Sequence, residues 1–198
     1  MRQFVVVGHE APTTADFELD DLASGAGRLD LLCRAAGAAL FLSHGIREDV
    51  TVHLVLRDEL TVRLEGATLR NARPDERTLA GLVRAALAER AEVVGHVPVD
   101  VSPGVTISGR DLAATVERVA ADGPVVQLHE DGESVVDADL PEDVGFVLSD
   151  HREFTAAEAD LLADAADRRV SLGPRAIHAD HAIAVAHNNL DTGGYTRY

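Results

Sequence analysis

Short apolar runs alternate with longer amphipathic stretches along most of the chain. Runs typical of strands cover 4–8, 50–56, 60–64, 125–128, 144–148 and 169–172. Stretches with helical spacing cover 28–43, 75–90, 111–120, 156–166 and 179–190. The glycine-rich polar segment 9–26 predicts a loop, and 93–107 predicts a β region interrupted by proline and glycine. Strands that alternate with helices indicate an α/β fold with a mainly parallel sheet flanked by helices.

Local signals set the expected ends of several elements. Three polar residues at 57–59 separate two alternating runs, which predicts a β-hairpin. Pro74, at a first helical position, is expected to open the helix over 75–90. Thr155 followed by Glu158 is typical of a capping box, in which each residue binds the main-chain N–H of the other.

Length and composition describe one folded domain. The chain has 198 residues and a hydrophobic fraction of 46%, which excludes a disordered chain. A single cysteine, Cys33, excludes a disulfide scaffold or a cysteine-rich zinc fold. No apolar run approaches the ~18 residues of a transmembrane helix, and the N-terminal apolar stretch is too short for a signal peptide. We therefore expect a single domain over 1–198 in the cytoplasm.

The chain is strongly acidic. It has 34 Asp and Glu against 18 basic residues, all of them arginine, which gives a net charge of −16. Such a balance at low salt argues against a nucleic-acid partner. Acidic residues spread over the whole chain, with no lysine, also suit a protein from a halophilic cell. At ~1 M salt the Debye length is only about 3 Å, so repulsion between distant acidic residues is screened. The acid is concentrated in 122–167, so an anionic partner should meet the N-terminal part and the tail.

Three of the predicted strands end in small or polar residues. The three ends cover 128–132, 148–151 and 171–177. Within the first of them, residues 129–132 predict a turn. Ligands of open α/β sheets collect beyond the carboxyl ends of strands, although glycine and aspartate are also common in simple turns. No strand is followed by the glycine pattern of a dinucleotide site, and the absence of lysine excludes a P-loop.

Two other kinds of site are disfavoured by the sequence. His178, His181 and His187 have a spacing that resembles a metal site, but His187 lies about 240° around the helix from His181. We interpret these histidines as ordinary polar helix residues and expect no metal. A serine and a histidine at 43–44, with Cys33, do not complete a nucleophilic triad.

Arginines flank an aspartate in the first predicted helix. Arg28 and Arg34 lie on either side of Asp30, and Arg47 follows the helix. Arginine makes planar bidentate contacts, so the three arginines are candidates for a cluster that binds a phosphate or a base. A solvated helix face with ion pairs four residues apart explains the same pattern.

Four segments in this order resemble one family of enzymes. They are RLDLLCRAAGAALFLSHGIREDV at 28–50, PDER at 74–77, LHEDG at 128–132 and SLGPRAIHADHAIAVAHNNLD at 171–191. The family is that of the archaeal tRNA pseudouridine-54 N1-methyltransferases, within the SPOUT superfamily of knotted methyltransferases. The resemblance runs over nearly the whole chain.

The resemblance implies an α/β domain with a C-terminal trefoil knot, the SPOUT fold, with the knot within about 125–195. It also implies a homodimer whose active site lies near the interface. On the tail helix, Ile183, Val185 and Leu190 form an apolar face that suits either dimer contacts or packing within the subunit.

The resemblance implies S-adenosylmethionine as cofactor, held mainly by main-chain groups of three loops. Carried over by position, the cofactor-binding residues are Leu128, Ser149, Leu172, Gly173, Pro174, Arg175, Ala176, Ile177 and Ala182. Ser149 stands where glycine is common in the family, and Ala182 stands where relatives often have cysteine. A thiol at the second position is therefore not required by this chain.

The implied reaction moves a methyl group from the sulfonium sulfur to N1 of pseudouridine 54 in the T-loop of tRNA, and the N1 proton must leave. We hypothesise that Asp30 accepts this proton or orients the base edge. Arg28, Arg34, His44 and Arg47 are then expected to bind the T-arm, with the target base unstacked. The alternatives are the related rRNA pseudouridine N1-methyltransferase, a non-catalytic knotted RNA-binding protein and a small-molecule α/β enzyme.

Overall fold

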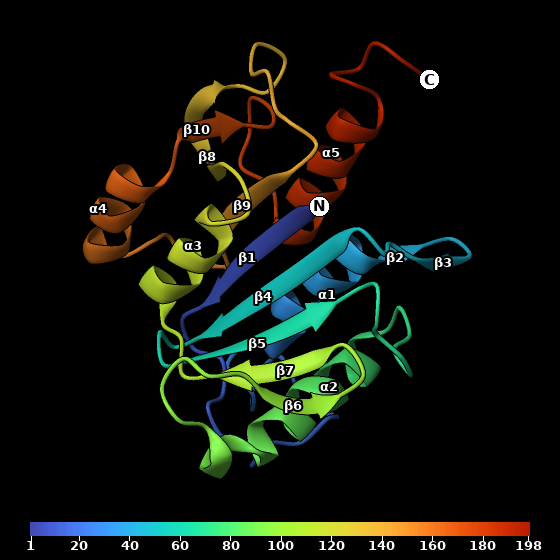
Figure 1. The fold of residues 1–198 in the computed structure, drawn as a ribbon, viewed down its shortest axis with the longest axis vertical. Coiled ribbons are helices and arrows are strands. Elements are labelled where there is room, and N and C mark those ends of the chain that lie inside the picture. The colour runs from blue at the N-terminus through green and yellow to red at the C-terminus, as the bar shows by residue number, and fades with distance from the viewer.

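The computed structural model describes residues 1–198 and contains one eight-stranded sheet with helices on both faces (Figure 1). A separate two-stranded hairpin is formed by β2 (Phe41–Leu42) and β3 (Gly45–Ile46). The strands of the large sheet are β1 (Arg2–Gly8), β4 (Val50–Leu56), β5 (Leu60–Glu65), β6 (Val99–Ser102), β7 (Val105–Ser108), β8 (Val125–Ser134), β9 (Val144–Ser149) and β10 (Arg168–Ser171).

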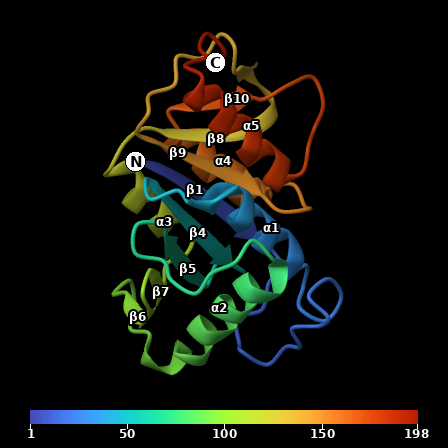
Figure 2. The same cartoon turned by 90° about the vertical axis from the view of Figure 1, so that its right-hand side faces the viewer.

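The helices form two layers, one on each face of the sheet. They are α1 (Leu29–Leu40), α2 (Glu76–Ala88), α3 (Leu112–Ala120), α4 (Ala156–Ala165) and α5 (Ala179–Asp191), with a short 3₁₀ turn, η1 (Arg90–Glu92). In Figure 2, α5, α1 and α2 follow one another along one face, while α3 and α4 cover the other in Figure 1. The longest helices have 13 residues, and none is both long and apolar enough to pass through a bilayer.

The sheet has a parallel half and an antiparallel half. Its strand order is β10-β8-β9-β1-β4-β5-β7-β6, and the pairs from β10 to β4 are all parallel. The remaining pairs, from β4 to β6, are antiparallel and include the predicted hairpin. The expected α/β architecture with a mainly parallel sheet is confirmed, and the parallel half contains the strands that end in small or polar residues.

β1 is the centre of the fold, because it pairs with β4 on one side and β9 on the other and all seven of its residues are buried. Successive side chains point to opposite faces. Phe4 and Val6 join the core under α1 and α5, whereas Val5 and Val7 join the core under α3 and α4. A strand buried on both faces explains why this run is continuously apolar rather than alternating.

α5 packs its apolar face inside the subunit. Ile183 is fully buried and Leu190 is 8% exposed, and both belong to the main core. For Ile183 and Leu190, packing within the subunit is the use that is observed. Val185, the third residue of the predicted face, is only half-buried and does not belong to the core.

Three expected boundaries were wrong. The helix predicted over 28–43 ends at Leu40, because Phe41 is extended and pairs with Ile46 in the small hairpin. Pro74 does not occupy a first helical position; Asp75 is the N-cap of α2, and Pro74 precedes it. By contrast, the capping box at the start of α4 is present as predicted.

The third wrong boundary is the turn expected at 129–132, which lies within β8. The pairing of β8 with β10 nevertheless jumps from Gln127–Arg169 to Glu133–Val170. The intervening segment 128–132 therefore leaves the ladder and is free to shape a pocket at this edge.

A buried polar network joins β1 to α1 and α5. Arg2 Nη1 donates to His187 Nδ1 at 3.0 Å, and His187 Nε2 donates to the Ala39 carbonyl at 3.0 Å. Arg2 also pairs with Asp191 at 2.6 Å. Burial, together with the charges of Arg47 and Arg2, lowers the pKa of His187 to about 4. The neutral imidazole is therefore the form that the folded protein requires.

This network predicts a loss of stability in mild acid. The unfolded chain binds a proton at His187 near its ordinary pKa of 6.5, but the folded protein resists protonation down to about pH 4. Its contribution is therefore complete above pH 6.5 and falls by about 3 kcal/mol as the pH drops to 4. Urea unfolding between pH 4.5 and 7.5 should show a smaller slope in His187→Gln than in the wild type. Equal slopes would contradict this assignment.

Candidate active site

A cavity of about 460 Å³ opens at the carboxyl ends of β8, β9 and β10. Its lining residues fall within 128–130, 148–154 and 171–182. These segments meet because parallel strands end at the same edge of a sheet. Pockets for small molecules measure roughly 300–1,000 Å³, so the cavity is large enough for a nucleoside-sized ligand.

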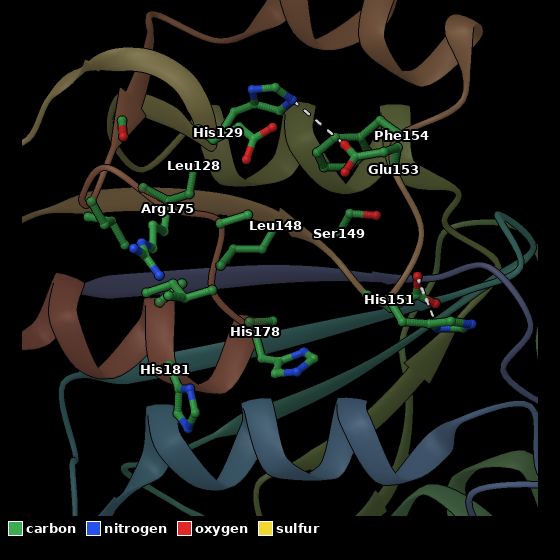
Figure 3. A pocket seen from close by; sticks show the side chains of 18 of the residues that line it. Leu128, His129, Leu148, Ser149, His151, Glu153, Phe154, Arg175, His178 and His181 are labelled. Carbon is green, nitrogen blue, oxygen red and sulfur yellow. Dashed lines mark ion pairs between the residues drawn. The ribbon is translucent and has the colours of Figure 1, made fainter.

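Most of the predicted cofactor residues line this cavity (Figure 3). Pro174 is the exception, although its neighbours on both sides are part of the lining. The structure brings together Leu128, Ser149, Leu172, Gly173, Arg175, Ala176, Ile177 and Ala182.

The cavity combines apolar side chains with free main-chain groups. Leu128, Leu148 and Ala182 line it and are buried. The main-chain N–H groups of Gly173 and of 175–177 donate no hydrogen bond within the chain. Since main-chain donors are normally paired in folded proteins, these groups suit the polar edge of a flat ring such as adenine resting on the apolar side chains.

Acidic side chains outnumber arginines around the cavity. Glu130, Asp150 and Glu153 line it together with Arg152 and Arg175. A ligand with a positive centre, such as a sulfonium, is favoured in this field over a phosphate. The residues present therefore fit S-adenosylmethionine in size, in polarity and in charge.

The Asp150 carboxylate organises one wall of the cavity. Its side chain is 0% exposed. It accepts hydrogen bonds from the main-chain N–H groups of His9 and Arg152, each at 2.9 Å. The ring of His9 also lies 3.0 Å from it. His9 was not predicted from the sequence, because its position directly after the buried strand β1 was the only available signal.

Asp30 lies in the first turn of α1 and is not part of the cavity lining. Arg28 binds both of its oxygens, at 2.9 and 3.0 Å, and Arg34 lies 3.9 Å away. The hydrogen bonds from Arg28 hold the pKa of Asp30 below its ordinary value of 3.8, against the opposing effect of burial. Asp30 is therefore ionised at neutral pH. The charge of Asp150 also acts on Arg28, so this end of α1 faces the cavity wall.

The other two predicted RNA-binding residues lie beyond the opposite end of α1. Arg47 donates its main-chain N–H to the Leu40 carbonyl at 2.7 Å and pairs with Asp191 at 2.6 Å. His44 is exposed in the turn between β2 and β3. Because the 12 residues of α1 span about 18 Å, the three arginines do not form the single cluster that the sequence suggested.

The cysteine and the histidines that could serve as a nucleophile or as metal ligands are not arranged for these roles. Burial raises the pKa of the Cys33 thiol above its ordinary value, so the thiol stays protonated. His187 contacts Ala39 near the C-terminal ends of α5 and α1. His178 and His181 lie at the start of α5 with their rings 6.3 Å apart, and both point toward α1 in Figure 3. No group of three or more His, Cys, Asp or Glu side chains is arranged to hold a metal ion.

A family model described as SAM-dependent RNA methyltransferase matches residues 1–195. The chain belongs to this family. Relatives from Haloferax volcanii and Haloarcula marismortui, both named tRNA (pseudouridine(54)-N(1))-methyltransferase, are each 61% identical over 198 residues, 100% of both chains. A relative of the same name from Methanococcoides burtonii is 39% identical over 197 residues, 96% of each chain. The resemblance seen in the sequence is confirmed.

The fold of this RNA methyltransferase is also found in a solved structure, Archaeoglobus fulgidus Nep1 bound to S-adenosylhomocysteine. The TM-score is 0.67, and the match covers 96% of this chain and 97% of that one. At 13% sequence identity, the likeness concerns the fold alone.

The two departures from the family pattern are compatible with the cavity of this RNA methyltransferase. The Ser149 hydroxyl donates to the Arg152 carbonyl, so it stabilises the wall segment instead of obstructing the cavity. Ala182 is 7% exposed and presents only a methyl group. The single cysteine of the chain, Cys33, does not line the cavity, so no cysteine thiol does so.

The main chains of β8 and β10 approach each other closely at Gly132, at the end of the segment of β8 that is not paired with β10. A Cβ atom at Gly132 would lie 2.5 Å from the Val170 carbonyl carbon and 2.6 Å from its nitrogen. Real Cβ atoms do not approach backbone that closely. Glycine is therefore required where the two strands rejoin beyond the cavity.

We expect Gly132→Ala to push β8 away from β10 and to lower the free energy of unfolding by about 1–3 kcal/mol. Gly45→Ala is the matched control, because a Cβ at Gly45 meets no atom within 4 Å. Urea unfolding in molar KCl should separate the two variants. Equal midpoints would show that the β8–β10 contact relaxes without cost.

Proposed function

We propose that this protein methylates N1 of pseudouridine 54 in the T-loop of tRNA, with S-adenosylmethionine as the methyl donor. The observation that carries the proposal is the full-length identity of 61% to two relatives named for this reaction. The cavity at the ends of β8, β9 and β10 is the matching physical feature, since its size, its free main-chain groups and its acidic surroundings suit that cofactor.

Bound S-adenosylmethionine supplies a methyl group activated by the sulfonium charge. The side chains of Leu128, Leu148 and Ala182 would hold its apolar surface. The free main-chain N–H groups of Gly173 and of 175–177 would bind its polar edges, so these contacts need no charged side chain. The acidic residues around the cavity would stabilise the positive centre and exclude phosphate.

The first turn of α1 is the proposed place of proton removal. Asp30 is ionised and lies between Arg28 and Arg34, so it is able to accept the N1 proton or to orient the base through these arginines. The same arginines would stabilise negative charge that develops on the base. Arg47 and His44 would contact the T-arm farther along the surface, beyond the other end of α1.

RNA binding by a chain of net charge −16 follows from where the charge lies. Fourteen of the acids lie in 122–167, a different part of the sequence from 28–47, which carries these arginines; of the fourteen, Asp150 nevertheless acts electrostatically on Arg28. At molar salt, repulsion beyond about 3 Å is screened and the local arginine contacts decide affinity. The 61% identical relatives come from Haloferax volcanii and Haloarcula marismortui, which is consistent with a salty cell interior. The proposed location is the cytoplasm, where tRNA is modified.

The proposal includes the family's assembly and topology. The chain would be a single domain over 1–198 with its trefoil knot within about 125–195, where β10 lies outside β8 in the sheet and α5 returns to pack on α1. The homodimer would use the exposed face of α5, which carries Ala184 and Asn188, because the opposite face is occupied by the core. No metal would take part.

The decisive experiment is methyl transfer in molar KCl. Protein and labelled S-adenosylmethionine are mixed with matched tRNAs that carry uridine or pseudouridine at position 54. Label should enter only the pseudouridine tRNA. Cofactor binding without transfer to either tRNA would favour the rRNA enzyme or a non-catalytic RNA-binding protein. If the protein neither binds S-adenosylmethionine nor transfers a methyl group, the proposal is refuted. A small-molecule enzyme is then the remaining alternative.

Asp30→Asn tests the proposed role of the carboxylate. The substitution keeps the size of the side chain and removes the charge that holds Arg28, so kcat should fall at least about 100-fold. The affinity for S-adenosylmethionine should be unchanged, because Asp30 does not line the cavity. Asp16→Asn, at an exposed position, is the control and should turn over normally. Survival of turnover in Asp30→Asn would make Asp30 a structural residue.

A further inference from the structure

His9 joins the two ends of the cavity wall that runs from Ser149 to Thr155. Its Nδ1 lies 3.0 Å from Asp150 Oδ1, and its Nε2 lies 2.9 Å from Glu158 Oε2. Asp150 stands near the start of the wall, and Glu158 lies in the first turn of α4, just past its end. One imidazole ring therefore spans the base of the loop.

With both carboxylates ionised, the geometry favours a doubly protonated ring. Both partners are carboxylates, which only accept hydrogen bonds when ionised, and a neutral imidazole has a single N–H. A neutral His9 would leave one ring nitrogen with its lone pair directed at a carboxylate oxygen. The imidazolium instead donates to both carboxylates in charge-assisted bonds, which are shorter and stronger than neutral ones.

The surroundings of His9 favour this charged form. Burial by itself lowers the pKa of His9, but the hydrogen bonds to Glu158 and Asp150 outweigh it, so the pKa lies above the ordinary value of 6.5. Burial raises the pKa of Glu158, yet the hydrogen bonds from His9 and Thr155 bring it below its ordinary value. Among the other titratable and charged groups, His151 lies 3.6 Å from Asp150, Arg152 donates its main-chain N–H to it, and Asp150 acts electrostatically on Arg28. Glu10 pairs in turn with His151 and Arg152.

Both carboxylates also support the main chain of the wall. Asp150 accepts the N–H of Arg152, and Glu158 accepts the N–H of Thr155 at 2.7 Å. The residues between these anchors line the cavity, from Ser149 to Phe154. Loss of the imidazolium would leave two adjacent carboxylates without their shared donor and free the wall to move.

We propose that His9, as an imidazolium, is a positioning residue that holds the 149–155 wall in the shape that binds S-adenosylmethionine. This inference rests on the proposed function. It adds a residue outside the cavity lining to the machinery of cofactor binding, and it makes cofactor affinity depend on pH. As the pH rises through the raised pKa of His9, the clamp loses its proton and affinity should fall.

The first test needs no cofactor. Hydrogen–deuterium exchange of the cofactor-free protein in molar KCl should be about 10-fold faster or more over 149–155 in His9→Ala than in the wild type. His96→Ala, at an exposed position on the loop before β6, is the matched control and should exchange as the wild type does. Wild-type exchange over this segment in His9→Ala would overturn the clamp.

The second test is the pH dependence of cofactor affinity, measured by calorimetry from pH 6 to 9. Wild-type affinity for S-adenosylmethionine should fall as pH rises, whereas His9→Ala should bind about 10- to 100-fold more weakly at pH 6 with a flat profile. His9→Gln offers an amide N–H toward Glu158 and should recover part of the affinity but not the pH dependence. Glu158→Gln removes one of the two charges and should move the midpoint to lower pH.

The outcomes separate this inference from the proposed function. If the wild type does not bind S-adenosylmethionine, the proposed function fails, and the exchange experiment still decides whether His9 holds the wall. If the wild type binds and both His9 variants keep its affinity and its pH profile, the inference is wrong. His9→Gln keeps the test valid if His9→Ala does not fold, which thermal unfolding will show.

Discussion

A carboxylate that is shielded from water must be paired within the protein, and Asp150 is the clearest case in this fold. Its side chain is 0% exposed, and its partners come from the end of β1, from the ring of His9 and from the following loop. This requirement ties the central strand to the wall of the cavity. The shape of the cavity therefore depends on a buried carboxylate whose polar partners must all be in place.

The same requirement applies to the arginines that we propose to contact RNA. Arg28 binds both oxygens of Asp30, Arg34 lies 3.9 Å from Asp30, and Arg47 pairs with Asp191. An arginine that is already paired is oriented before a ligand arrives, so less conformational entropy would be lost if it binds RNA. Short-range pairs also survive high salt better than a diffuse positive field, because screening acts mainly on distant charges.

Much of the cavity lining was predictable, because ligands of parallel α/β sheets collect at the segments that follow the strands. The sequence predicted strand ends at 128–132, 148–151 and 171–177, and residues 128–130, 148–151, 171–173 and 175–177 of these segments line one cavity. His9 was not recognised, since a histidine that follows an apolar strand carries no local sign of its partners. Asp150 and Glu158 are 141 and 149 residues away in the chain. Similarly, Arg28 and Arg47 are near in sequence but lie beyond opposite ends of α1.

By itself, the sequence determined the alternation of strands and helices, the hairpin and the capping box, because these depend on periodicity and on contacts between residues a few positions apart. It did not determine that the first helix stops at Leu40 or that β8 continues past 129–132, since both depend on pairing with other strands. The strand order and the meeting of His9 with Asp150 and Glu158 were decided only by the tertiary structure. Parallel strands are joined by long crossovers, so their order and register follow from the packing of the whole sheet and not from any local segment.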